Sequence, residues 1–364
     1  MVQKSVQDLI DEQVASDRET GVQVAVYRDG VLVVDAVAGV ADPATGRPVT
    51  SDTVFYTWSM GKAMTSTLVH RLVSRGLFDY DTPIAAIWPE FGANGKEAVT
   101  VRHGLQHTAG VPGIGPSTTI TDICDWNLIC ARIASFTPWW EPGTRTGYHA
   151  YTFGFIMGEL IRRATGKPLA SVLRDEIGTP LGVASSLYFG MPATEHGRLA
   201  RLVDPPSSPD AAEFSLPPDS PMLRSSAPSL WPSATLGNRP DVLSADIPAG
   251  GKMTARAIAR MYAALIGPVD GVRLLSPATV AAITTDTFTG EDQVFGMPAT
   301  WGLGFSIGRP GSQTDNTAFG MGGAGGTYGY ADPANGLAVA YCKNRQTMDF
   351  TSAQQLIDVV AEHA

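Results

Sequence analysis

Runs of strand-forming residues stand near both ends of this 364-residue chain, and helical patterns fill most of the stretch between them. Near the N-terminal end, residues 22–27 and 31–39 are rich in valine and alanine and flank Arg28-Asp29-Gly30. An Asp-Gly pair between β-branched runs is a strong signal for a β-hairpin. Further strands are expected near the other end, at residues 301–307, 319–330 and 336–342. We therefore predict one antiparallel sheet built from both ends of the chain.

Helical periodicity predicts the elements that cover this sheet. The first residues form an amphipathic helix, and a later helix begins at the threonine cap Thr254. Another helix follows Tyr148 and stops at Gly166, with Arg162 and Arg163 in its last turn. The predicted fold class is therefore α+β, with helices at both ends of the chain packed on the sheet. The last helix carries one apolar face, made of Ala353, Leu356, Ile357, Val360 and Ala361.

The length of the chain suggests two interleaved lobes. Residues 1–77 and 245–364 are expected to form an α/β lobe that contains the central antiparallel sheet. Residues 78–244, which combine short helical pieces with tight turns, are expected to form an inserted, mainly helical lobe. Its last part, from about Asp204 to Pro248, is rich in proline and serine. Two readings of this segment stay open: a solvated linker and the wall of a binding site.

Composition restricts the partners and the compartment. A net charge of −9 argues against nucleic acid and anionic membranes as partners. The first residues lack a continuous apolar stretch, so neither a signal peptide nor a membrane anchor is expected, and no run approaches the length of a membrane span. Cys124, Cys130 and Cys342 are odd in number and lack zinc-site spacing. We expect them to be reduced core residues of a cytoplasmic protein.

The stretch Thr57-Trp58-Ser59-Met60-Gly61-Lys62 carries the strongest chemical signal. Apolar residues recur at helical spacing from Met60 onward, so a helix is expected with Ser59 at its mouth. Residues three apart on a helix share a face, which brings Lys62 within reach of the Ser59 hydroxyl. Burial makes an amine partly neutral, so Lys62 could take the Ser59 proton, and N–H groups of the first turn would stabilise negative charge nearby.

Ser-x-x-Lys also occurs by chance, and it then usually marks a solvated helix face. Lys62 departs from that reading in two ways. Among the six lysines of the chain, it alone has a serine three residues before it. It also lies in an otherwise apolar helix, where an unpaired charge is costly. The pattern therefore favours a serine nucleophile assisted by a lysine.

Further motifs follow in order along the chain: residues 105–110 (LQHTAG), 142–150 (PGTRTGYHA), 301–304 (WGLG) and Met321-Gly322-Gly323. Together with Ser59 and Lys62, they resemble the serine β-lactamase and penicillin-recognising superfamily. The similarity is to its class C β-lactamase-like esterases, the family VIII carboxylesterases. It covers nearly the whole chain and implies a β-lactamase/transpeptidase-like fold, and several ordered motifs are far more specific than one Ser-x-x-Lys.

The resemblance implies roles for individual residues. Ser59 matches the nucleophile that forms an acyl-enzyme, Lys62 the lysine that eases its deprotonation, and Tyr148 the tyrosine that shuttles a proton. We expect a phenol held between an ammonium and a hydroxyl to have its anionic form favoured. The backbone N–H groups of Ser59 and Ala324 match the oxyanion hole. Met321, Gly322 and Gly323 match the substrate-binding third motif, where glycine lets only backbone approach the acyl group.

Two positions depart from the β-lactamase pattern. β-Lactamases and peptidases carry a cation where this chain has Met321, and that cation pairs with the substrate carboxylate. They also carry an asparagine where this chain has Ala150, and Tyr-His-Ala resembles the esterase branch instead. Both differences predict a neutral acyl donor and poor β-lactamase activity.

Three other classes of protein fit the sequence less well. His103 and His107 lie four apart, as zinc ligands on a helix often do, but Gly104 weakens the helix and no third ligand is evident. A Ser-His-Asp hydrolase is disfavoured because residue 57 is threonine, so Ser59 is not in a Gly-x-Ser-x-Gly elbow. A non-catalytic binding protein is disfavoured because serine, lysine and tyrosine all stand at their ordered positions.

The sequence thus predicts a serine hydrolase that cleaves small-molecule esters through an acyl-Ser59 intermediate, without a metal or organic cofactor. An acyltransferase of secondary metabolism, passing the acyl group to an alcohol or amine, is the main alternative. The two differ in whether the cleft excludes water and holds an acceptor. The proline- and serine-rich segment and the pair Trp139-Trp140 are candidates for the cleft wall.

Overall fold

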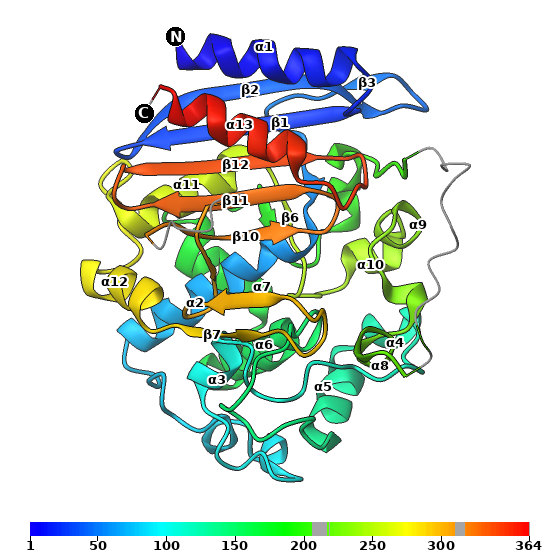
Figure 1. Cartoon of the computed structure of the whole chain (residues 1–364), viewed down its shortest axis with the longest axis vertical. Helices are drawn as coiled ribbons and strands as arrows, with labels where there is room; N and C mark the ends of the chain where they lie inside the picture. The colour runs from blue at the N-terminus through cyan, green and yellow to red at the C-terminus, as the bar shows by residue number, and fades with distance from the viewer. Residues whose placement is uncertain (206–216, 218, 310–316, 364) are drawn as a thin grey trace.

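The computed structural model describes residues 1–205, 217, 219–309 and 317–363. Its largest feature is a nine-stranded antiparallel sheet in the order β3-β2-β1-β12-β11-β10-β9-β8-β7 (Figure 1). β1 and β12 pair from Val22 opposite Lys343 to Arg28 opposite Leu337, so the two ends of the chain meet in the middle of the sheet. The prediction of one antiparallel sheet from both ends is confirmed. The strands are β1 Gly21–Arg28, β2 Val31–Asp42, β3 Arg47–Pro48, β7 Phe288–Glu291, β8 Pro298–Trp301, β9 Ser306–Ile307, β10 Phe319–Gly323, β11 Thr327–Asp332 and β12 Leu337–Lys343.

The predicted hairpin joins β1 to β2. Asp29 and Gly30 both have positive φ, 49° and 79°, as a tight two-residue hairpin turn requires. Side chains alternate along β1: Val22 and Val24 belong to the core on one face of the sheet, and Ala25 belongs to the core on the other. The strand is mostly apolar because both of its faces are covered, with Gln23 and Arg28 as its polar residues.

The two terminal helices cover one face of the sheet. α1 (Val2–Ala15) and α13 (Thr351–Ala361) pack against each other and lie over β1, β2 and β12 in Figure 1. Val6 and Ile10 of α1 and Leu356 of α13 are fully buried there. The predicted covering by terminal helices is therefore confirmed.

The remaining helices lie on the other face and beyond it. α11 (Ala255–Ile266) packs on β1, β11 and β12, and the hydroxyl of Thr254 caps it by accepting a hydrogen bond from the Ala257 N–H. α2 (Lys62–Ser74) packs on α6 (Thr152–Thr165), which ends as predicted at Gly166 with φ of 67°. The other helices are α3 Val101–Leu105, α4 Ile120–Ile123, α5 Trp126–Ser135, α7 Leu169–Leu173 and α12 Pro277–Thr285, with short helical turns η2 Ile84–Ala86, η3 Pro89–Gly92, η4 Arg174–Gly178 and η5 Ala193–Arg198.

A second, three-stranded sheet links distant segments in the order β4-β6-β5, with bounds Phe55–Tyr56, Lys252–Met253 and Leu187–Tyr188. It leads the chain from β4 directly into the Ser59 region. Four short helices precede β6 along the chain: α8 Pro221–Ser225, η6 Pro228–Leu230, α9 Ala234–Gly237 and α10 Pro240–Ser244. From Pro221 on, the proline- and serine-rich segment therefore contains short helices, and prolines occupy their first turns. Residues 206–216 and 218 lie outside the described residues.

One predicted strand proves to be two. Residues 301–307 contain the end of β8 and the whole of β9, separated by a turn in which the Gly302 N–H donates to the Phe305 carbonyl. Gly304 has a φ of 83°, and a Cβ on Gly302 would lie 2.0 Å from the Ile283 carbonyl oxygen. The alternating pattern of Trp-Gly-Leu-Gly-Phe suggested a strand, but its glycines serve this turn.

The three cysteines are free thiols; Cys130 and Cys342 are buried, and Cys124 is half-buried. Across the described residues, each helix is too short or too polar to cross a bilayer.

A buried ion pair fastens the two ends of the chain together. Lys343 at the end of β12 donates to Glu19 over 2.7 Å, and both side chains are about as inaccessible as core residues, at 1% and 2% exposed. Ser352 at the start of α13 donates to the same Glu19 oxygen over 2.7 Å. Removing one partner would leave an uncompensated charge in the core.

We expect Lys343→Met to lower the free energy of unfolding by about 3–5 kcal/mol, because Glu19 is left buried without its cation. The measurement is urea or thermal unfolding of the variant beside the wild-type protein. The double variant Glu19→Gln/Lys343→Met is the control and should lose clearly less, since no charge remains buried. A single variant as stable as the double variant would contradict this reason, because the unpaired charge of Glu19 would then cost nothing.

Candidate active site

Ser59 lies in a tight turn between the small sheet and α2. The turn, η1 (Trp58–Gly61), is a 3₁₀ helix, and the α-helix itself begins at Lys62 rather than at Met60. The Nζ of Lys62 lies 2.9 Å from the Oγ of Ser59. The predicted reach of Lys62 to the serine hydroxyl is therefore present.

The residue before Ser59 has an unusual backbone conformation. Trp58 has a φ of 49°, in the left-handed region that bulky residues rarely adopt. Its ring stacks on Tyr56 at 4.3 Å between centroids, and its Nε1 donates to Gln346 over 2.7 Å. These contacts hold a strained residue in place, as is common beside reacting groups. The chain can thus turn sharply and present Ser59 at the end of α2.

Glycines allow the segment before β6 to approach this turn closely. A Cβ on Gly61 would lie 2.3 Å from the Gly251 nitrogen, and one on Gly154 would lie 2.2 Å from the Ala249 nitrogen. Backbone hydrogen bonds join Thr57 to Gly251 over 2.9 Å and Gly251 to Trp58 over 3.1 Å. The close packing brings the carbonyl of Ala249 to the base of the site.

Lys62 is fully buried. Its Nζ contacts the Ser59 hydroxyl and donates to the Ala249 carbonyl over 3.1 Å, and neither partner carries a formal charge. Desolvation therefore lowers the pKa of Lys62 to about 7. A substantial neutral fraction exists near neutral pH, in agreement with the expectation from sequence.

Tyr148 completes the cluster. Its hydroxyl is hydrogen-bonded to Ser59, and the Lys62 Nζ lies over its ring, 4.8 Å from the centroid. Trp301 stacks on the ring at 5.6 Å and His107 lies against it at 5.0 Å. Burial raises the pKa of Tyr148, and the hydrogen bond with Ser59 only partly offsets this effect. The expectation that the phenolate is favoured is therefore wrong, because Lys62 faces the ring instead of neutralising a phenolate oxygen, and the resting tyrosine is protonated.

The two histidines considered as metal ligands have other roles. The Nδ1 of His103 accepts from the Thr100 N–H and so closes the capping box of α3. The Nδ1 of His107 accepts from the His149 N–H over 3.1 Å, and burial lowers the pKa of His107 well below its usual range. Among the described residues, no group of three or more His, Cys, Asp or Glu side chains is placed to hold a metal ion. His107 instead supports the ring of Tyr148.

The end of β10 faces Ser59. Met321, Gly322, Gly323 and Ala324 line the same pocket as Ser59, as the motif predicted. Gly323 is required for a reason that the sequence did not reveal: a Cβ there would lie 1.9 Å from the Thr57 carbonyl oxygen. A Cβ on Gly322 would lie 3.2 Å from the ring of Phe350 and 3.3 Å from the ring of Tyr328. Glycine thus allows the strand to pack beside the serine turn, which brings Ala324 to the pocket.

These residues open into a pocket of about 640 Å³, a volume suited to a small-molecule ligand. Ala150 lines it too. Residues 222–232 form one wall, so part of the proline- and serine-rich segment does wall the site. Three of its lining residues, Phe295, Met297 and Met348, are also large apolar side chains exposed to solvent. Its apolar lining includes Met222, Leu230, Trp231, Pro232, Ile247, Val294, Phe295, Met297, Pro298, Ala299, Trp301, Met321, Met348 and Phe350.

The pair Trp139-Trp140 does not line this pocket, so that prediction is wrong. Trp139 packs under the guanidinium of Arg224, 4.2 Å from the ring centroid. Trp140 is buried and its Nε1 donates to the Thr108 carbonyl. Trp139 therefore contacts the segment that forms the wall, whereas Trp140 packs against His149.

Sequence reasoning missed several residues of the site. Tyr56, Trp58, Tyr151 and Asp292 all line the pocket beside Ser59. Tyr56 and Trp58 flank the nucleophile along the chain and could have been suspected as aromatic neighbours of Ser59. Asp292 has no motif around it, and only the folding of β7 and β8 brings it to the pocket.

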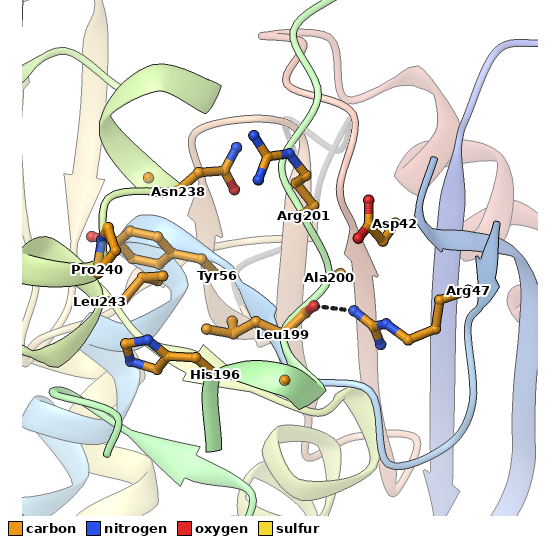
Figure 2. Close-up of a pocket in the computed structure, with 12 residues that line it drawn as sticks. Asp42, Arg47, Tyr56, His196, Leu199, Ala200, Arg201, Asn238, Pro240 and Leu243 are labelled. Carbon is orange, nitrogen blue, oxygen red and sulfur yellow. Dashed lines mark hydrogen bonds between the residues drawn. The ribbon is translucent and has the colours of Figure 1, made fainter. Parts of the chain in front are cut away.

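A second pocket of about 270 Å³ shares Tyr56 with the first (Figure 2). Its lining is more polar and includes Asp42, Arg47, His196 and Arg201. Figure 2 shows the Arg47 guanidinium donating to the Leu199 carbonyl. None of Ser59, Lys62 and Tyr148 reaches this pocket. The chemistry therefore belongs to the larger pocket.

Comparison with known proteins agrees with this geometry. Residues 6–362 match the family described as Beta-lactamase. The chain is 37% identical to "Esterase/beta-lactamase LipL" of Mycobacterium tuberculosis (strain ATCC 25618 / H37Rv), over 89% of this chain and 77% of that protein. It is 31% identical to a structure titled as a family VIII carboxylesterase, with a TM-score of 0.89 over 100% of this chain and 98% of that one. A penicillin-binding protein homolog from Caulobacter crescentus is 33% identical, with a TM-score of 0.86 over 100% and 98%.

The low pKa of Lys62 predicts the pH dependence of activity. Below pH about 7 the amine is protonated and cannot accept the Ser59 proton, so kcat/KM should rise as pH increases through about 7. The measurement is ester hydrolysis across the folded pH range. Lys252→Met is the matched control, because burial also lowers the pKa of that lysine to about 7, and it does not line the pocket. If the rise in kcat/KM disappeared in Lys252→Met, the titrating group would be Lys252 and not Lys62.

Replacing Tyr148 tests its hydrogen bond with Ser59. Tyr148→Phe should lower kcat on the order of a hundredfold, as for loss of a general acid–base group, with a much smaller change in KM. Tyr151→Phe is the control: this tyrosine also lines the pocket, but its hydroxyl donates to the Leu230 carbonyl. Equal losses in both variants would argue against a special role of Tyr148.

Proposed function

The chain belongs to the beta-lactamase family, and from this premise we propose that it is a serine carboxylesterase acting on uncharged esters through an acyl-Ser59 intermediate. The observation that carries the proposal is the buried Lys62 amine, 2.9 Å from the hydroxyl of Ser59, which lines an apolar pocket. LipL and the family VIII carboxylesterase are both named as esterases.

In the acylation step, the neutral amine of Lys62 accepts the Ser59 proton while Oγ bonds to the ester carbonyl carbon. The carbonyl oxygen becomes negative, and the N–H groups of Ser59 and Ala324 stabilise it. The protonated Tyr148 then donates its proton to the leaving alkoxide as the carbon–oxygen bond breaks. The Lys62 ammonium then returns a proton to the tyrosine. Lys62 is neutral and Tyr148 is protonated again, and Ser59 is acylated.

Deacylation reverses the proton path with water in place of the alcohol. Tyr148 accepts the water proton while its own phenolic proton passes to the neutral Lys62, and the water oxygen attacks the acyl carbon. Ser59 Oγ then leaves with a proton returned from Lys62, so Lys62 is neutral and Tyr148 protonated at the end of the cycle. The low pKa of Lys62 suits both directions, because its two protonation states are close in free energy near neutral pH.

The pocket supports an uncharged substrate. Its described lining residues include no lysine, arginine or histidine, and Met321 is buried where a cation would bind a substrate carboxylate. A β-lactam or peptidoglycan carboxylate would therefore enter without a charge-assisted partner. Hydrolysis of such compounds is expected to be slow relative to that of uncharged esters.

The size of the pocket supports small to medium acyl groups. Apolar side chains form most of its walls, and burying a methylene against them contributes about 0.8 kcal/mol. The same apolar lining favours a second candidate function, transfer of the acyl group to an alcohol or amine. An apolar site disfavours bulk water, which lets a bound acceptor compete for the acyl-enzyme.

The test is hydrolysis of a short p-nitrophenyl ester by the wild-type protein and by Ser59→Ala, with intact mass measured during turnover. We expect release of p-nitrophenol and a transient acyl adduct with the wild-type protein only. Ser306→Ala, which also changes a serine in the pocket lining, is the matched control and should still form the adduct.

Three other outcomes would change the proposal. An adduct that persists in water and decays on addition of an alcohol would favour the acyltransferase. Turnover by Ser59→Ala would remove the assignment of the nucleophile, and no release of p-nitrophenol from any ester would contradict esterase activity.

A further inference from the structure

Asp292 introduces a negative charge into an otherwise uncharged pocket. It lies just after β7, lines the pocket together with Ser59 and Tyr148, and is only 3% exposed. Every other described lining residue is apolar, aromatic, glycine or a hydroxyl-bearing side chain. Acidic side chains are almost never this deeply buried without a partner, so its position calls for an explanation.

One carboxylate oxygen has a structural role and the other does not. Oδ1 accepts hydrogen bonds from the N–H groups of Val294 and Phe295, over 2.8 and 2.9 Å, and so holds the turn that carries the pocket rim. Oδ2 accepts no hydrogen bond from any described residue and is not sealed off from solvent. Because the residue lines the pocket, Oδ2 is available to a bound ligand.

No nearby cation neutralises this carboxylate within the described chain. Lys62 bonds to Ser59 and Ala249, and it does not belong to the pocket lining. Arg145 reaches the neighbouring Gln293 from the exposed surface and forms no ion pair with Asp292. The charge of Asp292 also raises the pKa of Tyr148, so its field extends to the reacting groups. In a poorly hydrated pocket such a field acts strongly on a substrate charge.

We infer that Asp292 is a specificity-determining residue that repels anionic substrates and favours esters carrying a cationic group, such as an ammonium. The inference rests on the proposed esterase activity and extends its substrate class from uncharged to cationic esters. A cation in the pocket would compensate the buried charge of Asp292, whereas an anion would add a second uncompensated charge. The absence of a cation at Met321 and the carboxylate of Asp292 therefore both disfavour anionic substrates.

Asp292→Asn tests the charge while keeping the turn. The asparagine carbonyl can accept the same two hydrogen bonds from Val294 and Phe295, so the rim should retain its shape. Three p-nitrophenyl esters of similar length serve as probes: the hexanoate, the adipate monoester with a free carboxylate, and the ω-trimethylammonio-hexanoate. Each shares the same leaving group. The quantity measured is the ratio of kcat/KM for the cationic ester to that for the anionic ester.

We expect the wild-type protein to prefer the cationic ester, and Asp292→Asn to reduce the cation-to-anion ratio on the order of tenfold or more. Because the ratio is taken within one variant, any effect on Tyr148 cancels. Glu291→Gln is the matched control, since it removes the same charge one residue away at an exposed position of β7. Its ratio should change by less than about twofold, because exposed charges are screened.

The outcomes separate this inference from the proposed function. An unchanged ratio in Asp292→Asn, or an equal change in Glu291→Gln, overturns the role of Asp292 while esterase activity stands. Absence of hydrolysis of all three esters overturns both. As a second measurement on the wild-type protein, the hexyltrimethylammonium ion should inhibit hexanoate hydrolysis more strongly than the hexanoate ion does. Equal or reversed potency would also overturn the inference.

Discussion

The burial of one amine beside one hydroxyl is the interaction on which the site depends. Lys62 is placed where its amine hydrogen-bonds only to uncharged groups, Ser59 and the Ala249 carbonyl, and burial lowers its pKa to about 7 with no carboxylate partner to offset the effect. The surrounding structure serves this arrangement. Gly61 and Gly154 let the backbone around Ala249 pass between η1 and α6, and Gly323 brings β10 against Thr57. A larger residue at any of these positions would push apart the elements that keep water from the amine.

Most of the fold could be predicted from sequence patterns with a clear physical basis. The hairpin at Asp29-Gly30, the helix stop at Gly166 and the cap at Thr254 were all predicted, since each depends on local backbone chemistry. The strand predicted at residues 301–307 was wrong because alternating glycines imitate a strand while serving a turn. For the same local reasons, the Ser59–Lys62 contact could be predicted from helical spacing alone.

Other parts of the site depend on long-range packing and could not be predicted. The left-handed conformation of Trp58 is maintained by Gln346, which is distant in sequence. The state of Tyr148 was predicted incorrectly because the direction from which Lys62 approaches its ring is set by packing, not by spacing. Asp292 is one of 35 acidic residues, and nothing in its neighbourhood along the chain distinguishes it. Its importance comes from an apolar enclosure that exists only in the folded protein.

The meeting of the two chain ends in the sheet has a consequence for biosynthesis. Ser59 and Lys62 leave the ribosome early, but the β10 edge, Gln346 and Phe350, which complete their surroundings, are made hundreds of residues later. Helical segments with local contacts can form during translation, whereas β1 must wait for β12. Until then one edge of β1 has no strand to pair with, and unpaired edges invite aggregation. The nascent chain is therefore expected to remain inactive and to need protection until translation is nearly complete.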